Sequence, residues 1–296
     1  MDDRYAIEID LRDDRAAAPN CRTPAGLRFR SELLGHLRAG GFPVLEAQPA
    51  GGYDRNNPAH LTEAGRGLAR YHALVRTFRP RFRAAGRPAL PSLERSGPSA
   101  LARFTADAEP FLDPTDRARL SRASSFLWSQ FIRVPEALSG VLPVLPQLVV
   151  HGSYHPDVLV YRGDRLIGVT GFGCAAYDLR ALDLAHALGG FGAEAVGEEV
   201  GPGLDLDRAG TLMAAYRSVE PVPAAELAAL ALVLRARCLA GVLTGVAGFL
   251  PGPDASRSGE EARRLVDVIE RAAIRTRWLE REEPEMVSTL CDSLVA

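Results

Sequence analysis

Residues 148–188 read LVVHGSYHPDVLVYRGDRLIGVTGFGCAAYDLRALDLAHAL, and this stretch decides the fold of the chain. The apolar run Leu148–Val150 predicts a short strand, and the polar loop HGSYHPD follows it at residues 151–157. Two runs rich in β-branched residues, 158–161 and 166–169, flank four turn-forming residues. This pattern predicts a β-hairpin.

A second loop follows the hairpin at Gly171-Phe172-Gly173, and the sequence from Tyr177 onward predicts a helix. Polar loops therefore border the hairpin on both sides. Loops held by a rigid scaffold often carry binding or catalytic residues. We therefore expect a functional site between these two loops.

The order of these elements resembles the catalytic core of the aminoglycoside phosphotransferase family, part of the wider kinase-like group. In that family the first loop reads HGDxHxxN, and the second carries an Asp just before a Phe or another apolar residue. Matches occur at His151, Gly152, His155, Phe172 and Asp183-Leu184-Ala185. The resemblance implies an α+β, protein-kinase-like fold with a truncated small β lobe and a mainly helical large lobe. It also implies that Asp183 braces the catalytic loop by accepting backbone hydrogen bonds.

The residues that carry the family's chemistry differ in this chain. The family's catalytic Asp falls on Ser153, its metal-binding Asn on Val158 and its second metal-binding Asp on Gly171. A serine hydroxyl stays neutral near pH 7 and does not replace a carboxylate base. Valine and glycine have no side-chain oxygen for Mg²⁺. The alignment therefore predicts no catalytic residue, no metal site and no cofactor, unless Asp157 binds a metal from a shifted register.

Residues 1–58 are expected to form a reduced small lobe. Alternating apolar residues predict a strand at 5–11, a Thr-Pro capping signal predicts a helix at 23–39, and a second strand follows at 42–47. Only the turn-forming residues 48–59 stand where the family fits two more strands and the adenine-binding hinge. The alternative is that the hinge lies elsewhere in the sequence.

The charged residues also differ from those of a typical kinase. All 35 basic residues are arginine. The family's Lys–Glu pair, which holds nucleotide phosphates, falls on Glu8 and Glu32, and two carboxylates repel phosphate. The net charge of −2 gives no electrostatic case for nucleic acid or an anionic membrane as partner. The four cysteines lack disulfide or zinc-ligand spacing and predict free thiols.

Residues 59–296 are expected to form the helical large lobe around the central hairpin region 148–172. Apolar periodicity and capping signals predict helices at about 61–78, 99–106, 113–132, 206–218, 223–250, 259–280 and 284–295. Charged residues interrupt the apolar segment 224–250, which favours a buried helix or helical pair over a membrane span. The acidic N-terminal segment lacks the apolar region of a signal peptide and predicts a cytoplasmic protein.

The missing catalytic groups favour a non-catalytic binding protein derived from a phosphotransferase. Their loss would leave a less charged, roomier pocket for a small apolar or aromatic molecule. Eight residues are expected to line it: Trp128, Phe131, Ser153, Tyr154, His155, Asp157, Phe172 and Trp278. The lysine-free, Ala/Gly/Arg-rich composition is typical of a GC-rich genome. It favours self-resistance in an antibiotic-producing bacterium, by sequestration of the antibiotic.

An enzyme acting on the same pocket is the alternative hypothesis. It would be either a repurposed natural-product biosynthetic catalyst or an atypical ATP-dependent phosphotransferase. ATP turnover would identify the latter, and a change in ligand mass without ATP would identify the former. The sequence leaves the ligand and the oligomeric state open.

Overall fold

The computed structural model describes residues 23–45, 51–82, 89–196, 199–250 and 255–292. Its helices are α1 (Pro24–Ala39), α2 (Pro58–Val75), α3 (Ala89–Ala108), α4 (Pro114–Val141), α5 (Arg180–Phe191), α6 (Leu206–Arg217), α7 (Ala224–Ala247), α8 (Ala255–Arg281) and α9 (Glu283–Asp292). Its strands are β1 (Gln147–Val150), β2 (Leu159–Arg162), β3 (Arg165–Val169), β4 (Ala176–Leu179), β5 (Ala193–Val196) and β6 (Glu199–Leu204).

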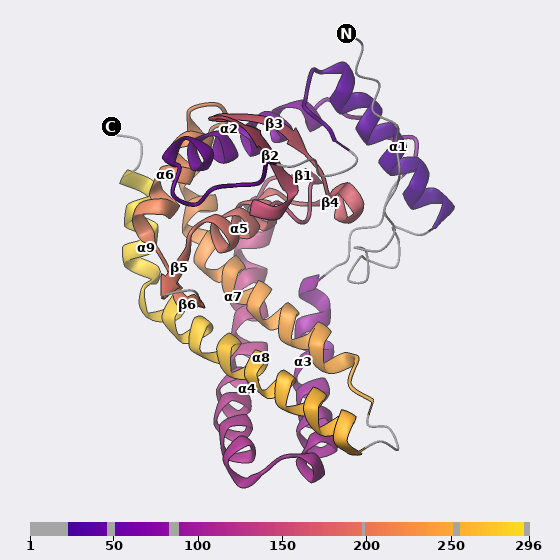
Figure 1. The fold of residues 1–296 in the computed structure, drawn as a ribbon, viewed down its shortest axis with the longest axis vertical. Coiled ribbons are helices and arrows are strands. Elements are labelled where there is room, and N and C mark those ends of the chain that lie inside the picture. Colours follow the sequence, from indigo (N-terminus) through magenta and orange to yellow (C-terminus); the bar gives the residue numbers. More distant parts are fainter. Residues whose placement is uncertain (1–22, 46–50, 83–88, 197–198, 251–254, 293–296) are drawn as a thin grey trace.

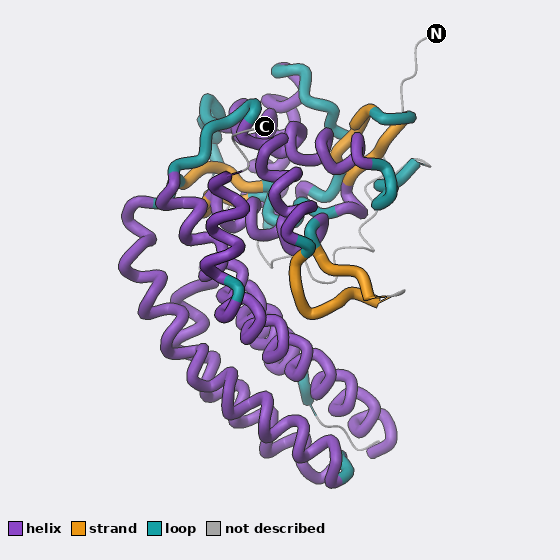
Figure 2. Tube along the Cα trace, turned by 90° about the vertical axis from the view of Figure 1, so that its left-hand side faces the viewer, coloured by secondary structure: helices purple, strands orange, loops and turns teal. Residues whose placement is uncertain are grey.

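The strands β1 to β4 lie with α1 and α2 at one end of the molecule (Figure 1). The long helices α3, α4, α7 and α8 pack on one another and extend away from that end, as the side view also shows (Figure 2). Helix α5 lies where the two parts meet and contacts α2, α6, α7 and β1. This mostly helical architecture with a small β portion confirms the expected protein-kinase-like fold.

The first described helix begins where the capping signal predicts. The Thr23 side chain accepts a hydrogen bond from the Gly26 N–H at 3.1 Å, and Pro24 occupies the first helical position. The first N–H groups of a helix have no acceptor within it. The Thr23 side chain accepts one of them, and proline at the first position has no N–H to satisfy. The predicted helix over 23–39 is confirmed.

Two helices are longer than the sequence pattern predicts. Helix α3 begins at Ala89 rather than 99, and α4 continues from 132 to Val141. Each contains an internal proline, Pro98 or Pro135. A proline removes one helical hydrogen bond. Here both helices still bury apolar side chains against their neighbours, so packing outweighs that loss.

The chain from Tyr177 to Leu179 is extended and not helical as predicted. It belongs to β4, which pairs antiparallel with β1 and places Tyr177 opposite Val149. Local sequence does not reveal this pairing, because the partner strand lies 27 or more residues earlier in the chain. The predicted hairpin is confirmed, with Leu159 paired to Val169 and Arg162 to Arg165.

Part of the expected small lobe pairs with the edges of this hairpin. Val44 forms a parallel bridge to Val169, and the Tyr161 N–H donates to the Gly51 carbonyl at 2.8 Å. The strand expected at 5–11 lies outside the described residues. The division of the chain at residue 58 stays a prediction.

Helix α7 has the length and apolar composition of a membrane span, and it is the one helix among the described residues that does. More than half of its most apolar window is buried inside the protein. It packs against α3, α4, α5 and α8. Its apolar surface is therefore covered by protein, as expected for a buried core helix. The cytoplasmic location stays a prediction.

Candidate active site

The loop between β1 and β2, residues 151–158, is fixed by one buried carboxylate. Asp183 on α5 has no exposed surface. Its two oxygens accept the His151 N–H at 2.6 Å and the Gly152 N–H at 2.8 Å. His72 on α2 lies 3.1 Å from the same carboxylate. The expected brace under the loop is confirmed, and it ties the loop to two helices.

The charge of Asp183 is stabilised despite its burial. Burial alone would raise the pKa of this carboxyl group, because it disfavours the charged form. The hydrogen bond from His72, the electrostatic attraction of the His72 and His151 imidazoles and the Gly152 N–H outweigh burial and hold the pKa below the ordinary value of 3.8. Asp183 is therefore an anion at neutral pH, suited to accepting backbone N–H groups.

His151 joins the first loop to the second. Its buried ring contacts the Thr170 carbonyl through Nε2 at 2.8 Å, while Nδ1 accepts the Ser153 N–H at 3.3 Å. Burial lowers the pKa of this histidine, so the ring is neutral and donates from Nε2. Gly152 follows with φ of 79°, and a Cβ there would lie 2.4 Å from the Cys174 carbonyl oxygen. Only glycine permits this close approach of the two loops.

His155 and Asp157 form the polar, accessible part of the loop. The His155 Nδ1 atom lies 3.5 Å from an Asp157 carboxylate oxygen and 3.3 Å from the Asp157 backbone nitrogen. The side chains are 33% and 89% exposed, respectively. A histidine beside a carboxylate can accept a proton and hold the resulting charge. The loop therefore carries a group able to accept a proton.

Val158 and Gly171, the positions that the resemblance aligns with the family's metal ligands, carry no side-chain oxygen. A Cβ built on Gly171 would lie 2.8 Å from the Val158 Cγ1 atom, and Gly171 has a φ of 77°. The valine methyl group therefore occupies the space into which a side chain at 171 would project. The described residues contain no cluster of three or more His, Cys, Asp or Glu suited to a metal. Because neither Val158 nor Gly171 offers an oxygen atom, these two positions do not fit a Mg²⁺ site of the family's kind.

The structure brings Ser153, Tyr154, His155, Asp157 and Phe172 together around the two loops. Tyr154 and Phe172 are buried there, and the Tyr154 hydroxyl donates to the Ala64 carbonyl at 2.9 Å. Their aromatic rings pack against His151. These two side chains thus form the floor of the loop in this structure, and their contact with a ligand stays a prediction.

The three other predicted ligand contacts lie on the long helices. Trp128 is 44% exposed on α4, while Phe131 is buried against Gly97 of α3. Trp278 on α8 lies against Gly203, the glycine near the end of β6. Helix α4, which carries Trp128 and Phe131, packs on α3, α7 and α8, and α8 contacts β6 at Trp278. A role for them in ligand binding remains a prediction.

Sequence reasoning missed two arginines that lie against the C-terminal half of α5. A Cβ built on Gly189 would lie 3.4 Å from the Arg237 Nη1 atom and 3.8 Å from the Arg275 Nη2 atom. A Cβ built on Gly190 would lie 3.2 Å from the His155 Cβ atom. The glycine pair thus allows both the loop and the two arginines to approach α5 at neighbouring positions. The signal in the sequence was an arginine within the apolar segment 224–250.

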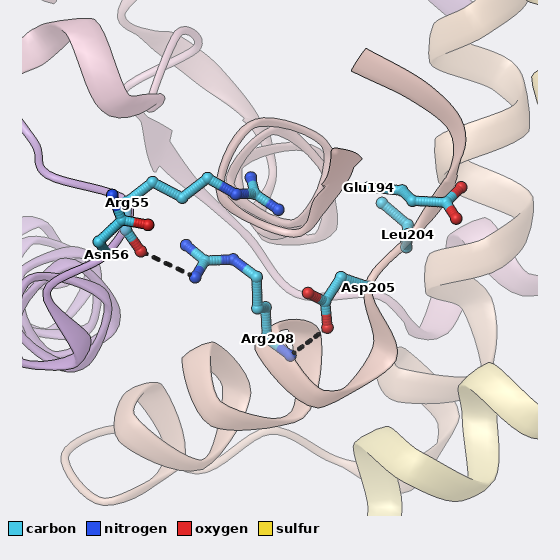
Figure 3. A pocket seen from close by; sticks show the side chains of 6 residues that line it. All are labelled: Arg55, Asn56, Glu194, Leu204, Asp205 and Arg208. Carbon is cyan, nitrogen blue, oxygen red and sulfur yellow. Dashed lines mark hydrogen bonds between the residues drawn. The ribbon is translucent and has the colours of Figure 1, made fainter. Parts of the chain in front are cut away.

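A separate open pocket of about 430 Å³ is lined by Arg55, Asn56, Glu194, Leu204, Asp205 and Arg208 (Figure 3). The Arg208 side chain donates to the Arg55 carbonyl at 3.1 Å, and its backbone N–H donates to the Asp205 carboxylate at 3.1 Å. None of the loop residues 151–158 contributes to this lining. Its charged groups stabilise the junction between β6, α6 and the segment before α2.

Comparison with known proteins was informative over most of the chain. Residues 5–222 match the sequence model of the phosphotransferase enzyme family, APH. A homoserine kinase of Parvibaculum lavamentivorans is 28% identical over 234 residues, which cover 79% of this chain and 66% of that protein. A homoserine kinase of Methylocella silvestris is 29% identical over 81% of this chain and 68% of its own length. The chain thus spans about two thirds of the length of these relatives.

A solved structure of a microcompartment-associated aminopropanol kinase superposes with a TM-score of 0.55 and 18% identity. The superposition covers 90% of this chain and 83% of the aminopropanol kinase chain. At this identity the likeness shows the fold alone.

The interpretation as a non-catalytic, drug-sequestering protein is wrong. It rested on substitutions at Ser153, Val158 and Gly171, whereas the relatives that align over most of the chain are kinases. The expectation that the chain is not an enzyme fails for the same reason, because the matched family consists of phosphotransferases. With 5–222 matched, this chain belongs to the phosphotransferase enzyme family.

Proposed function

We propose that this protein transfers the terminal phosphoryl group of ATP to a hydroxyl group of a small molecule. The main support for this proposal is the loop that Asp183 holds in place, with His155 and Asp157 on its accessible side. Family membership and the homoserine kinase relatives support the same reaction. Phosphoryl transfer depends mainly on positioning, and a loop fixed to two helices provides it.

His155 acts in this proposal as the proton acceptor. The substrate hydroxyl oxygen attacks the terminal phosphorus of ATP, the bond from that phosphorus to the ADP oxygen breaks, and the hydroxyl proton passes to the His155 imidazole. Its Nδ1 atom accepts the Asp157 backbone N–H at 3.3 Å and lies 3.5 Å from the Asp157 carboxylate, whose charge stabilises the imidazolium that forms. The products are ADP and a phosphate ester.

Homoserine is the first acceptor to test, since relatives over most of the chain are homoserine kinases. The purified chain is incubated with ATP, Mg²⁺ and a panel of small alcohols that includes L-homoserine. ADP is measured by a coupled assay and the ester by ³¹P NMR. We expect ADP and phosphate ester in equal amounts. If no alcohol in the panel yields an ester, the proposed function is wrong.

Replacing His155 by alanine is expected to lower kcat by about 10²–10³-fold, since a positioned proton acceptor contributes that much. Asp157→Asn keeps the shape but removes the charge and is expected to cause a smaller decrease. Both side chains are partly or largely exposed, so the melting temperature is expected to stay within a few degrees of the wild type. An unchanged kcat in His155→Ala would remove this residue from the mechanism.

A further inference from the structure

Two arginine side chains converge on the C-terminal half of α5. Arg237 comes from α7 and donates to the Ala185 carbonyl at 3.1 Å. Arg275 comes from α8 and contacts the Gly189 carbonyl through Nη2 at 3.4 Å. A nitrogen atom of each lies within 4 Å of the same point, the Cβ position of Gly189. The absence of a side chain at Gly189 leaves space between the two guanidinium groups and the helix.

Neither arginine has a carboxylate partner within the part of the chain that the structure describes. Other buried or half-buried arginines do: Arg180 pairs with Glu220 and Glu226, and Arg119 pairs with Asp116, Asp267 and Glu270. Burying a cation without a counter-charge is unfavourable. The pair is therefore a positive site without a direct counter-ion, although the Asp183 charge also attracts Arg237, and a bound anion would supply that counter-ion.

The titratable groups around Arg237 are Arg275, Cys238, Asp183 and His186. Burial, together with the neighbouring charge of Arg275, lowers the pKa of Arg237 to about 10. His186 on α5 has its pKa lowered to about 3, first by burial and then by the charge of Arg237. His186 is therefore neutral and adds no charge. The cations of the cluster are the two arginines.

The site lies next to the proposed proton acceptor. Gly190 follows Gly189 in α5, and His155 approaches within 3.2 Å of its Cβ position. The two arginines come from α7 and α8, the long helices of the large lobe (Figure 1). The hairpin β2–β3 and the described part of the expected small lobe, which pairs with it, lie on one side of α5, and the long helices extend on the other (Figure 1). An anion held by the arginines would therefore be on the acceptor side of the loop and not on the side of the small lobe.

We propose that Arg237 and Arg275 bind a carboxylate of the phosphoryl acceptor, so that the substrate is a small hydroxy acid anion. This inference rests on the proposed phosphotransferase function. The planar fork of a guanidinium matches the two oxygens of a carboxylate. Binding there would place the hydroxyl of a short acceptor beside His155.

Pairs of alcohols that differ by the carboxylate provide the test. L-Homoserine is compared with 3-amino-1-propanol, and D-glycerate with glycerol, by kcat/KM and by thermal stabilisation. We expect the carboxylates to be preferred by about 10- to 100-fold, the range for hydrogen bonds to a charged group. Arg237→Gln and Arg275→Gln are expected to raise KM for the carboxylate by a similar factor and to leave KM for ATP unchanged.

Arg271→Gln serves as the matched control, since Arg271 is exposed on α8 one turn before Arg275. It should change neither KM. The Arg237→Gln protein should melt no lower than the wild type, because the change removes a charge without a direct counter-ion. A lower melting temperature with an unchanged KM would assign Arg237 a purely structural role and overturn the inference.

The remaining outcomes separate this inference from the proposed function. If neutral and anionic alcohols are phosphorylated equally well, the carboxylate site is wrong while the phosphotransferase stands. If no alcohol is phosphorylated but homoserine, glycerate or malonate raises the melting temperature of the wild type and not of Arg237→Gln, the anion site stands without that function. If the variants raise KM for ATP instead, the arginines bind nucleotide phosphate. If neither turnover nor stabilisation occurs, both proposals are overturned.

Discussion

Replacing Asp183 by alanine is expected to lower the free energy of unfolding by about 3–5 kcal/mol, the cost of breaking a buried, paired charge. The change leaves the N–H groups of His151 and Gly152 without their acceptor in the protein interior, and it removes the partner of His72. Phosphoryl transfer is expected to fall below detection, since the loop that carries His155 loses its brace.

Urea unfolding followed by circular dichroism measures this effect. Asp157→Asn is the control on the same loop, because its carboxylate is 89% exposed and its stability should match the wild type. The stability of Asp183→Asn should lie between that of Asp183→Ala and that of Asp157→Asn, since an amide oxygen still accepts one N–H. A loss below about 1 kcal/mol in Asp183→Ala, the level of an ordinary substitution, would contradict the role of Asp183 as the brace.

The contribution of Asp183 should also depend on pH. Its folded pKa lies below 3.8, whereas an unfolded Asp titrates near 3.9. The stabilisation is therefore present above the unfolded pKa and is lost as the pH falls through the lower folded pKa. The difference in unfolding free energy between wild type and Asp183→Asn should be constant at neutral pH and shrink in the acid range. A difference that grows on acidification would reverse the sign of this pKa shift.

Replacing Arg180 by methionine is expected to lower the free energy of unfolding by about 3–5 kcal/mol, because it leaves the buried Glu226 carboxylate unpaired. Arg180 is 1% exposed at the start of α5. Its Nε lies 3.0 Å from Glu226 and its Nη1 lies 3.0 Å from Glu220, and both glutamates are buried. The pairs position the helix that carries Asp183 one turn later, so activity should fall as well.

The double variant Arg180→Met/Glu226→Leu separates the missing charge partner from a general loss of packing. Glu220 also pairs with Arg76 and keeps that partner, so the double variant should be more stable than Arg180→Met alone. Thermal and urea unfolding of the wild type, both single variants and the double variant give the coupling free energy between the two residues. A double variant as unstable as the sum of the two single changes would show that the charges are not coupled.

Local chemistry made several features predictable. A cap such as Thr23 acts within one helical turn, and alternating apolar residues with a turn define the hairpin β2–β3. The brace by Asp183 followed from the family resemblance. The end of α4 and the strand β4 were not predictable, because packing against distant helices and pairing with β1 decide them.

The functional interpretation failed for a related reason. Ser153, Val158 and Gly171 were compared with a motif one position at a time, and each substitution was counted as a loss. The neighbours of those positions in space were not visible in the sequence. The structure places the Asp157 carboxylate 3.5 Å from the His155 Nδ1 atom, and the linear motif does not predict this acidic partner. The relatives that align over most of the chain are kinases.

The sequence by itself determined the strands β1 to β3, the two loops beside the hairpin and most helices, since periodicity, caps and turns are properties of neighbouring residues. It also determined that arginine supplies every basic side chain. Only the tertiary structure decided that Arg237 and Arg275 share one face of α5 with no acid between them, and that Gly190 brings His155 to the same helix. These residues are up to 120 positions apart in the chain. Their proximity follows from the packing of α5, α7 and α8, which a local pattern does not encode.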